Sequence, residues 1–359
     1  MQLKAPAFWE SSGPLAWVLL PLSLLYAAIT CVRSLLFRFG LLKSLSLPVP
    51  IIFVGNLRAG GTGKTPMVIA IARALQQRGM KPGIISRGYL SKLPRNHTQE
   101  VFASDAADTV GDEPLVVKKQ VGPAIPVWIG ANRHQAGTAL LQAYPDCDVI
   151  ISDDGLQHLA LQREPARHHG RDLEIVVRDD RGEGNGFLLP AGPLRSSTQS
   201  PRDLTFQVKI NAPSSSDTAL PGEFLAKDHF LIHCEMLDAY QLIDPSKRRP
   251  LASFSAHPVL AVAGIANPNK FFTPLNELGI RYTPLALGDH ADYTNIRFAN
   301  YSADNQELIL MTEKDAVKCS YMNDPLIWVV PLQGNLPDAC VDQMIQVLNR
   351  PPMSSNSEV

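Results

Sequence analysis

Apolar residues along this 359-residue chain occur as short runs that alternate with segments of helical periodicity. Residues 49–54 (VPIIFV) form a β-branched run, a glycine-rich loop follows, and residues 66–75 repeat apolar positions at the spacing of a helix face. The same patterns predict three further strands and another helix: strands at residues 81–85, 124–129 and 148–152, and a helix at residues 133–143. This alternation predicts an α/β fold with a doubly wound, mostly parallel sheet.

The second half of the chain repeats the alternation on a smaller scale. Residues 211–221 (NAPSSSDTALP) are rich in Ser and Pro, lack an apolar period, and are the best linker candidate. Beyond them, strands predicted at residues 257–265, 307–312 and 327–331 indicate a second, smaller α/β domain. We therefore expect four parts: an N-terminal membrane anchor helix (1–45), a first α/β domain (46–220), a smaller C-terminal α/β domain (221–335), and a C-terminal helix with a disordered tail (336–359).

The longest apolar run suggests contact with a membrane. Residues 15–32 carry no charge over about 18 positions, near the lower limit for a helix that crosses a bilayer. Trp17 and Tyr26 suit a membrane interface, and Arg33 and Arg38 follow the run, which would keep the rest of the chain on the cytoplasmic side. We expect an anchor that either spans the bilayer or lies in its interface; the alternative is a buried core helix.

Composition narrows the function classes. The net charge is −1 and the pI is near 6.8, so no bulk attraction to nucleic acid is expected. The five cysteines are scattered without a CxxC pair, which excludes a zinc or disulfide framework of the usual kind. His229 and His233 stand four apart, but the sequence between them is typical of a strand and not of a metal-binding helix.

A glycine-rich loop lies between the first predicted strand and the first predicted helix. Residues 59–65 read AGGTGKT, and this strand–loop–helix context favours a phosphate-binding loop. The glycines allow backbone N–H groups to converge on phosphate oxygens, Lys64 would reach the outer phosphates, and the Thr65 hydroxyl would bind Mg²⁺. The residues expected to contact a nucleotide are Gly60, Gly61, Thr62, Gly63, Lys64 and Thr65.

The loop departs from the standard pattern GxxxxGK[ST]. That pattern requires glycine at position 58, where this chain has Arg58. The arrangement is similar to the variant loop of partition-type ATPases, but those carry lysine where this chain has Ala59.

Two acidic residues follow the predicted strand at residues 148–152. Asp153 and Asp154 would stand at the carboxyl end of a buried strand, the usual place for the second element of a nucleotide site. Carboxylate and hydroxyl oxygens are the ligands that Mg²⁺ prefers, so the expected metal ligands are Thr65 and one or both aspartates.

Several ordered segments carry a resemblance to a known family. They are GNLRAGGTGKTP (55–66), SRGY (86–89), GDEP (111–114), GANR (130–133), DDGLQH (153–158), GNGFLLPAGPLR (184–195), GIANPNKFF (264–272), GDH (288–290) and TEKDAVK (312–318). With these segments, the chain resembles the tetraacyldisaccharide 4'-kinase family of lipid A biosynthesis over nearly its whole length. The resemblance implies a P-loop NTPase-like fold and a kinase at the cytoplasmic face of the inner membrane. Such a kinase uses ATP and Mg²⁺ to phosphorylate the 4'-hydroxyl of a lipid-linked, acylated glucosamine disaccharide 1-phosphate, and no protein partner is implied.

The resemblance also implies roles for individual residues. Asp112 of GDEP matches the catalytic carboxylate of the family and His290 of GDH matches its partner, a dyad that would take the proton of the sugar hydroxyl. Lys64 completes the expected catalytic set. Arg133 is a candidate phosphate clamp, because guanidinium groups pair bidentately with phosphate oxygens. Arg87 and Asn185 are weaker candidates for substrate contact.

Three positions depart from the family pattern. Ser196 follows GPLR where the family usually has Glu, Arg178 stands where an Asp is expected after a strand, and Lys270 replaces an expected Arg. All three lie outside the phosphate and metal motifs, so they concern the substrate or domain-interface contacts.

Two other function classes stay open at this point. One is a partition- or targeting-type nucleotide switch that hydrolyses ATP without phosphorylating a metabolite. The other is a membrane-bound interaction protein with an inactive nucleotide fold. Turnover of ATP that depends on the acylated disaccharide would distinguish a kinase from both.

Overall fold

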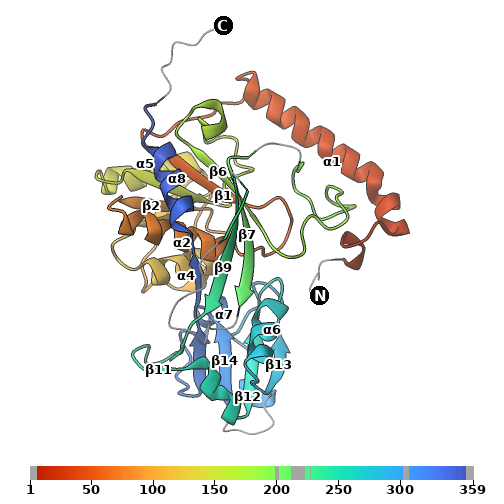
Figure 1. Cartoon of the computed structure of the whole chain (residues 1–359), viewed down its shortest axis with the longest axis vertical. Helices are drawn as coiled ribbons and strands as arrows, with labels where there is room; N and C mark the ends of the chain where they lie inside the picture. Colours follow the sequence, from red (N-terminus) through yellow and green to blue (C-terminus); the bar gives the residue numbers. More distant parts are fainter. Residues whose placement is uncertain (1–5, 199–201, 212–222, 227, 302–306, 353–359) are drawn as a thin grey trace.

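The computed structural model describes residues 6–198, 202–211, 223–226, 228–301 and 307–352. Most of the predicted linker (211–221) and most of the tail predicted to be disordered lie outside these residues. The described chain forms two α/β units that lie end to end, and helix α1 (Pro14–Arg38) runs along the outside of the larger unit (Figure 1).

The larger unit is built on a ten-stranded sheet. Six consecutive pairings in it are parallel, and the edge strands pair antiparallel, as the sequence predicted for a doubly wound sheet. In spatial order its strands are β16 (Leu332–Asn335), β9 (His229–Met236), β7 (Leu204–Asn211), β6 (Leu173–Arg178), β1 (Ile51–Gly55), β5 (Val149–Asp153), β2 (Pro82–Ser86), β4 (Val127–Gly130) and β3 (Thr98–Glu100), and β8 (Glu223–Ala226) pairs with β9.

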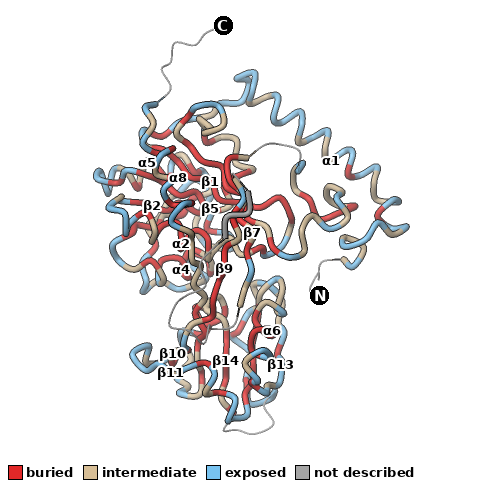
Figure 2. The backbone as a smooth tube through the Cα atoms, in the orientation of Figure 1, coloured by how far each residue is buried: buried red, intermediate tan, exposed pale blue. Residues whose placement is uncertain are grey.

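Helices cover both faces of this sheet because its central strands are apolar on both sides. Along β1, Ile52 and Val54 pack into one core, whereas Ile51 and Phe53 pack into the other. One face is covered by α2 (Lys64–Gln77), α4 (Asp112–Val121) and α8 (Asp338–Leu348), with the short α3 (Ala107–Val110) before α4, and the other by α5 (Arg133–Ala143). Figure 2 shows the resulting continuous buried interior of the larger unit. The predicted helix at residues 133–143 is confirmed with the same bounds.

The smaller unit contains a six-stranded sheet. Its strands, in spatial order, are β11 (Arg248–Arg249), β10 (Ala239–Gln241), β15 (Ile327–Val330), β14 (Leu308–Thr312), β12 (Val259–Ala263) and β13 (Tyr282–Ala286). Helix α6 (Asn269–Glu277) connects β12 to β13, and α7 (Glu313–Ala316) follows β14. Short 3₁₀ helices complete the described chain: η1 (Ala7–Trp9), η2 (Ala166–His168), η3 (Leu251–Ala256) and η4 (Phe298–Asn300).

Sheet membership differs from the division at residue 220 that the sequence suggested. Strands β8 and β9 follow that boundary, yet they pair within the sheet of the larger unit. The chain then enters the smaller unit and returns through β16, which pairs antiparallel with β9. A strand pattern shows that a segment is extended, but it does not show which sheet the segment joins, and this explains the difference. His229 and His233 lie in β9, as predicted.

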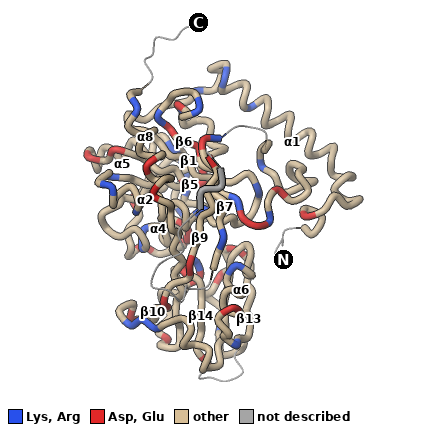
Figure 3. Tube along the Cα trace, in the orientation of Figure 1, with Lys and Arg blue, Asp and Glu red and all other residues tan. Residues whose placement is uncertain are grey.

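Helix α1 has little contact with the rest of the protein. It continues through Pro21, and of its residues only Ala16 and Ser23 are buried. Its 25 residues would span roughly 37 Å, enough to cross a bilayer. It carries no charged side chain before Arg33 (Figure 3). The exposed apolar surface argues against the alternative of a buried core helix.

Candidate functional site

The phosphate loop connects β1 to α2 at the centre of the larger sheet. Gly60 and Gly63 have φ angles of +99° and +94°, which residues with a Cβ rarely adopt. A Cβ on Gly61 would lie 3.2 Å from the Cβ of Ala266, so the smaller unit leaves little room there for a side chain. Helix α2 begins at Lys64 without a side-chain cap, and its first N–H groups are therefore available to an anion.

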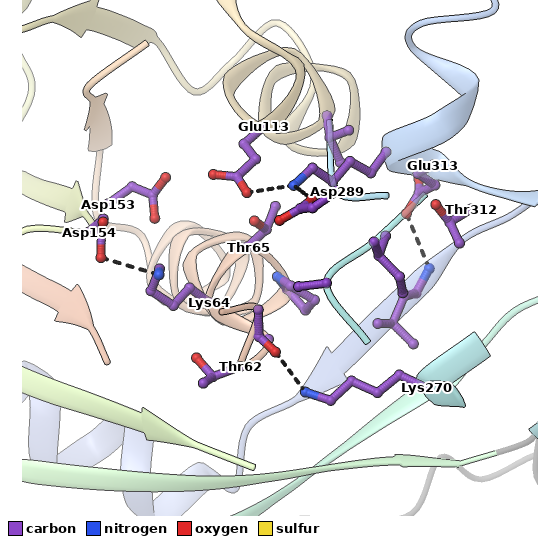
Figure 4. Close-up of a pocket in the computed structure, with 18 of the residues that line it drawn as sticks. Thr62, Lys64, Thr65, Glu113, Asp153, Asp154, Lys270, Asp289, Thr312 and Glu313 are labelled. Atoms are coloured by element: carbon purple, nitrogen blue, oxygen red, sulfur yellow. Dashed lines mark hydrogen bonds and ion pairs between the residues drawn. The ribbon is translucent and has the colours of Figure 1, made fainter. Parts of the chain in front are cut away.

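Lys64 is held between two oxygen acceptors. Its Nζ donates to Oδ1 of Asn56 at 3.1 Å. The same Nζ lies 3.2 Å from Oδ1 of Asp154 (Figure 4). Asn56 is buried, and its amide nitrogen also donates to the carbonyls of Arg58 and Gly60 at 2.6 and 3.1 Å. Asn56 therefore orients the lysine and holds the loop backbone together. Sequence analysis missed it, although it is the second residue of the GNLRAGGTGKTP segment.

The acidic pair lies beside the lysine because β5 pairs in parallel with β1, with Val54 next to Asp153. Asp153 is buried and accepts a hydrogen bond from Ser86 Oγ at 3.2 Å. Burial, reinforced by the charge of Glu113, raises the pKa of Asp153 to about 6. Its Oδ1 is buried without a hydrogen-bond partner, which is consistent with an oxygen reserved for a ligand.

Asp154 has the opposite electrostatic setting. Burial alone would raise its pKa, but Lys64 and Arg195 outweigh that effect and hold the pKa below its usual value. Arg195 contacts both of its carboxylate oxygens, at 3.3 and 3.2 Å. Asp154 is therefore ionised at neutral pH and balances two cations.

The donor set at this edge of the sheet fits a hard cation. Thr65 offers a hydroxyl, and the two aspartates offer carboxylate oxygens, one of them unpartnered. Within the described residues no three or more His, Cys, Asp or Glu side chains gather as a metal site, and this site itself offers only two carboxylates and a hydroxyl. A cation here would thus complete its shell with phosphate oxygens and water, the mode that suits Mg²⁺.

The predicted dyad is formed across the two units. Nδ1 of His290, in the smaller unit, lies 2.8 Å from Oδ2 of Asp112, the first residue of α4. His290 has a φ angle of +59°, and its ring packs edge-on against Tyr89 at 5.4 Å between centroids. Burial would raise the pKa of Asp112, but the hydrogen bond to His290 and the charge of Lys314 lower it.

Lys314 fixes the turn that carries the histidine. Its Nζ lies 2.9 Å from Glu113 of the larger unit and 2.8 Å from Asp289. These carboxylates raise the pKa of Lys314 despite its burial. Sequence analysis quoted the segments that contain these residues but assigned them no role.

A cavity of about 590 Å³ lies between the two units and joins these groups. The larger unit lines it with the phosphate loop, Asp153 and Asp154, and the smaller unit lines it with His290, Lys314 and Lys270. Figure 4 shows Asp153 and Asp154 on one side of the cavity and Thr312 and Glu313 on the other. Asp112 lies beneath His290, so the imidazole is the part of the dyad that faces the cavity.

Two of the three predicted substrate residues line this cavity. Arg87 is exposed in it, whereas Arg133 is buried and donates to the carbonyls of Gly130 and Asp153 at 3.0 and 3.2 Å. Burial lowers the pKa of Arg133 to about 10. Asn185 does not line the cavity. Its amide donates to the carbonyl of Phe8 in residues 6–13, which precede α1 and are called the N-terminal segment below.

Lys270 reaches the phosphate loop from the smaller unit. Its Nζ lies 3.2 Å from the carbonyl oxygen of Gly61 and 2.6 Å from Oδ2 of Asp179, the residue that follows β6. The Asp expected at position 178 is thus found one residue later, where it pairs with the lysine that replaces the expected Arg.

Glu313 lies at the junction of the two units. Its side chain accepts hydrogen bonds from Gln120 of α4 and, at 3.2 Å, from the backbone N–H of Leu332. Burial raises the pKa of Glu313 to about 7.

These features define a class of protein. A glycine-rich loop between a parallel strand and a helix, with its lysine beside an acidic pair on the neighbouring strand, is the site of a P-loop nucleotide-binding protein. A carboxylate–imidazole pair across the same cavity is placed where it could accept the proton of a hydroxyl group.

Comparison with known proteins identifies the family. The family model described as Tetraacyldisaccharide-1-P 4'-kinase matches residues 15–349. A protein from Polynucleobacter asymbioticus named Tetraacyldisaccharide 4'-kinase is 45% identical over 353 residues, which cover 97% of this chain and 96% of that protein. A protein of the same name from Herminiimonas arsenicoxydans is 42% identical over 354 residues, 95% of this chain and 94% of the other. The chain belongs to the tetraacyldisaccharide-1-P 4'-kinase family.

A solved structure agrees with this assignment. The crystal structure of the apo form of LpxK from Aquifex aeolicus in complex with ATP aligns with a TM-score of 0.69 and 26% identity. The alignment covers 93% of this chain and 99% of that one. The family resemblance, the fold class and the enzyme class predicted from the sequence are confirmed.

Proposed function

We propose that this protein is an ATP-dependent kinase that transfers the γ-phosphoryl group to the 4'-hydroxyl of an acylated glucosamine disaccharide 1-phosphate. The observation that carries the proposal is the Asp112–His290 pair, because His290 lines the same cavity as the phosphate loop. A nucleotide switch needs only water as the acceptor, whereas this cavity has a second wall with its own proton acceptor. Family membership supports the same substrate class.

In the proposed reaction the phosphate loop binds ATP. Backbone N–H groups at the start of α2 and the Nζ of Lys64 contact the phosphate oxygens. Thr65, Asp153 and Asp154 would hold Mg²⁺, and a bound Mg²⁺ would neutralise charge on the phosphates. Binding of phosphate would also draw Lys64 away from Asp154, since the phosphates compete with that carboxylate for the ammonium group.

The dyad then takes the proton of the 4'-hydroxyl as its oxygen attacks the γ-phosphorus. Because Nδ1 of His290 is bonded to Asp112, Nε2 is the ring nitrogen left to accept a proton. The buried carboxylate of Asp112 holds the ring in this orientation. The O–P bond to the sugar forms, the bond to the β–γ bridging oxygen breaks, and ADP leaves.

The apolar surface of α1 supports a membrane location for the reaction. We propose that α1 anchors the protein at the cytoplasmic face of the inner membrane, where the acyl chains of the substrate stay in the bilayer. The disaccharide then reaches the cavity from the membrane surface. Arg87, which is exposed in the cavity, is the candidate to contact the substrate phosphate.

Mass spectrometry of the product tests the proposal. Full-length protein, ATP, Mg²⁺ and the acylated disaccharide 1-phosphate should give a product heavier by one phosphoryl group. ATP hydrolysis that is independent of the disaccharide would instead support a nucleotide switch. Asp112→Asn should lower kcat about 10²- to 10⁴-fold, while Asp108→Asn, a change at an exposed carboxylate one turn earlier, should not. Normal turnover by Asp112→Asn would contradict the proposed dyad.

A further inference from the structure

The segment from Gly184 to Arg195 lies between helix α1 and the phosphate loop. On the helix side, Ser23 Oγ donates to the carbonyl of Leu188 at 2.7 Å and accepts from the N–H of Ala191 at 3.0 Å. The Tyr26 hydroxyl donates to the carbonyl of Arg195 at 2.9 Å. These are specific polar contacts in a helix that is mostly apolar and exposed.

The other side of the same segment pairs with the start of the phosphate loop. The N–H of Ala59 donates to the carbonyl of Pro193 at 2.7 Å, and the N–H of Arg195 donates to the carbonyl of Leu57 at 2.6 Å. Arg58 and Leu194 form an antiparallel bridge between them. The backbone at the start of the phosphate loop is therefore hydrogen-bonded to residues 184–195, and the other side of that segment is hydrogen-bonded to α1.

Arg58 provides a second route from the N-terminal segment to the loop. Its side chain is buried, forms an ion pair with Glu10, and donates to the carbonyls of Arg181 and Gly182 at 3.3 and 3.4 Å. Its own carbonyl accepts from Asn56, the residue that orients Lys64. The departure from the glycine of the standard loop is thus explained, because an arginine at this position ties the loop to the segment before α1.

Asn185 belongs to the same network of hydrogen bonds. Its side-chain nitrogen donates to the carbonyls of Phe8 and Ala191 at 3.0 and 2.9 Å, and its backbone N–H donates to the carbonyl of Trp9 at 2.8 Å. It fixes the N-terminal segment against residues 184–195, which accounts for its distance from the cavity.

We infer that the N-terminal segment and α1 are part of the ATP site in addition to serving as an anchor, with Glu10 and Tyr26 as positioning residues for the phosphate loop. A loop with three glycines must be ordered before its N–H groups converge on phosphate, and contacts that order it beforehand strengthen binding. Two contacts connect these residues to the site: the carbonyl of Arg58 accepts a hydrogen bond from Asn56, and the side chain of Arg195 donates to the carboxylate of Asp154. The inference rests on the proposed function in one respect, since it requires that this loop binds ATP.

The test compares ATP affinity with lipid affinity in the full-length protein. The variants are Glu10→Gln, Tyr26→Phe and the double variant, with Glu277→Gln, an exposed glutamate of α6, as the matched control. Each is measured in detergent micelles for the Kd of Mg·ATP by calorimetry, for the KM of ATP and of the acylated disaccharide 1-phosphate, and for thermal unfolding. Glu10 is half-exposed, so its variant should fold.

Glu10→Gln should raise both the Kd and the KM for ATP about 3- to 10-fold, with the KM for the lipid unchanged. Tyr26→Phe should act in the same direction, and Glu10→Asp should restore part of the affinity. An unchanged Kd for Mg·ATP in the double variant would overturn the inference. A lower unfolding temperature together with equal changes in the KM of ATP and the KM of the lipid would also overturn it, because that pattern indicates a structural role only. A wild-type protein that binds Mg·ATP but transfers no phosphate would refute the proposed function and leave this comparison of Kd values intact.

Discussion

The carboxylate of Asp179 joins the two units and offers a sharp test of the electrostatics around the phosphate loop. Its side chain is 1% exposed and pairs with Arg181 at 2.6 Å and with Lys270 of the smaller unit at 2.6 Å. Both cations also donate to the carbonyl of Gly61, at 2.7 and 3.2 Å. One buried anion therefore holds two cations against the loop.

Removal of the anion and removal of one cation should lower the free energy of unfolding by different amounts. Asp179→Asn leaves Lys270 and Arg181 close together without an anion, and breaking a buried pair in this way costs about 3–5 kcal/mol of unfolding free energy. Lys270→Met leaves Asp179 still paired with Arg181 and keeps most of the side-chain volume, so we expect a cost of about 1–2 kcal/mol.

Urea unfolding, followed by tryptophan fluorescence and by far-ultraviolet circular dichroism, measures both costs. The control is Asp146→Asn, which removes one partner of an exposed pair with Lys81 and should change stability little. If Asp179→Asn cost no more than Lys270→Met, the assignment of Asp179 as the shared counter-ion would be incorrect. The double variant should cost less than the sum, because removal of Lys270 relieves the repulsion between the two cations.

Three further changes test other parts of the structure. The folded-state pKa of Glu313, about 7, exceeds the unfolded value of 4.5, so the contribution of Glu313 to stability is full below pH 4.5 and is lost as the pH rises through 7. Relative to the Glu313→Gln variant, the wild type should therefore lose roughly 3 kcal/mol of unfolding free energy across that pH window. Urea titrations at successive pH values measure this loss. Gly83→Ala places a Cβ 2.7 Å from Cδ2 of the buried Leu140, and the overpacking should cost about 1–3 kcal/mol in the same assay. Asp315→Asn weakens the hydrogen bond from Tyr293 that holds the turn after His290, and should lower kcat while the Kd of Mg·ATP stays constant.

The elements that the sequence predicted well are those specified by local pattern. Strand β1, the glycine-rich loop and helix α2 follow one another within about 30 residues, so apolar spacing and glycine placement are sufficient to locate them. The structure also brings the predicted lysine, acidic pair and dyad to one cavity, and their catalytic roles stay predictions. Motif chemistry indicated the lysine and the acidic pair, and family resemblance indicated the dyad. Chemistry concentrated in short segments is visible in a single sequence.

Residues that act through distant partners were harder to assign. Asn185 was predicted to contact substrate, but it bonds to Phe8, which is 177 positions away along the chain. Lys270 was noted only as a departure, because its partner Asp179 lies in the other unit. No periodicity in a sequence records which side chains meet across two separately folded sheets, so such pairs need the tertiary structure.

The way the chain passes between the two units determines the geometry of the site. It leaves the larger sheet at β9 and returns at β16, and these two strands pair antiparallel side by side. At the crossing, the N–H of Leu237 donates to the carbonyl of Pro331 at 2.9 Å. The smaller unit is thus held at two adjacent points, and its strand ends, which carry His290 and Lys314, are directed toward the phosphate loop. A single connection would leave the small unit free to turn about it. The paired connection restricts that freedom, and this would allow the proposed proton acceptor of the smaller unit to serve the phosphate loop of the larger one.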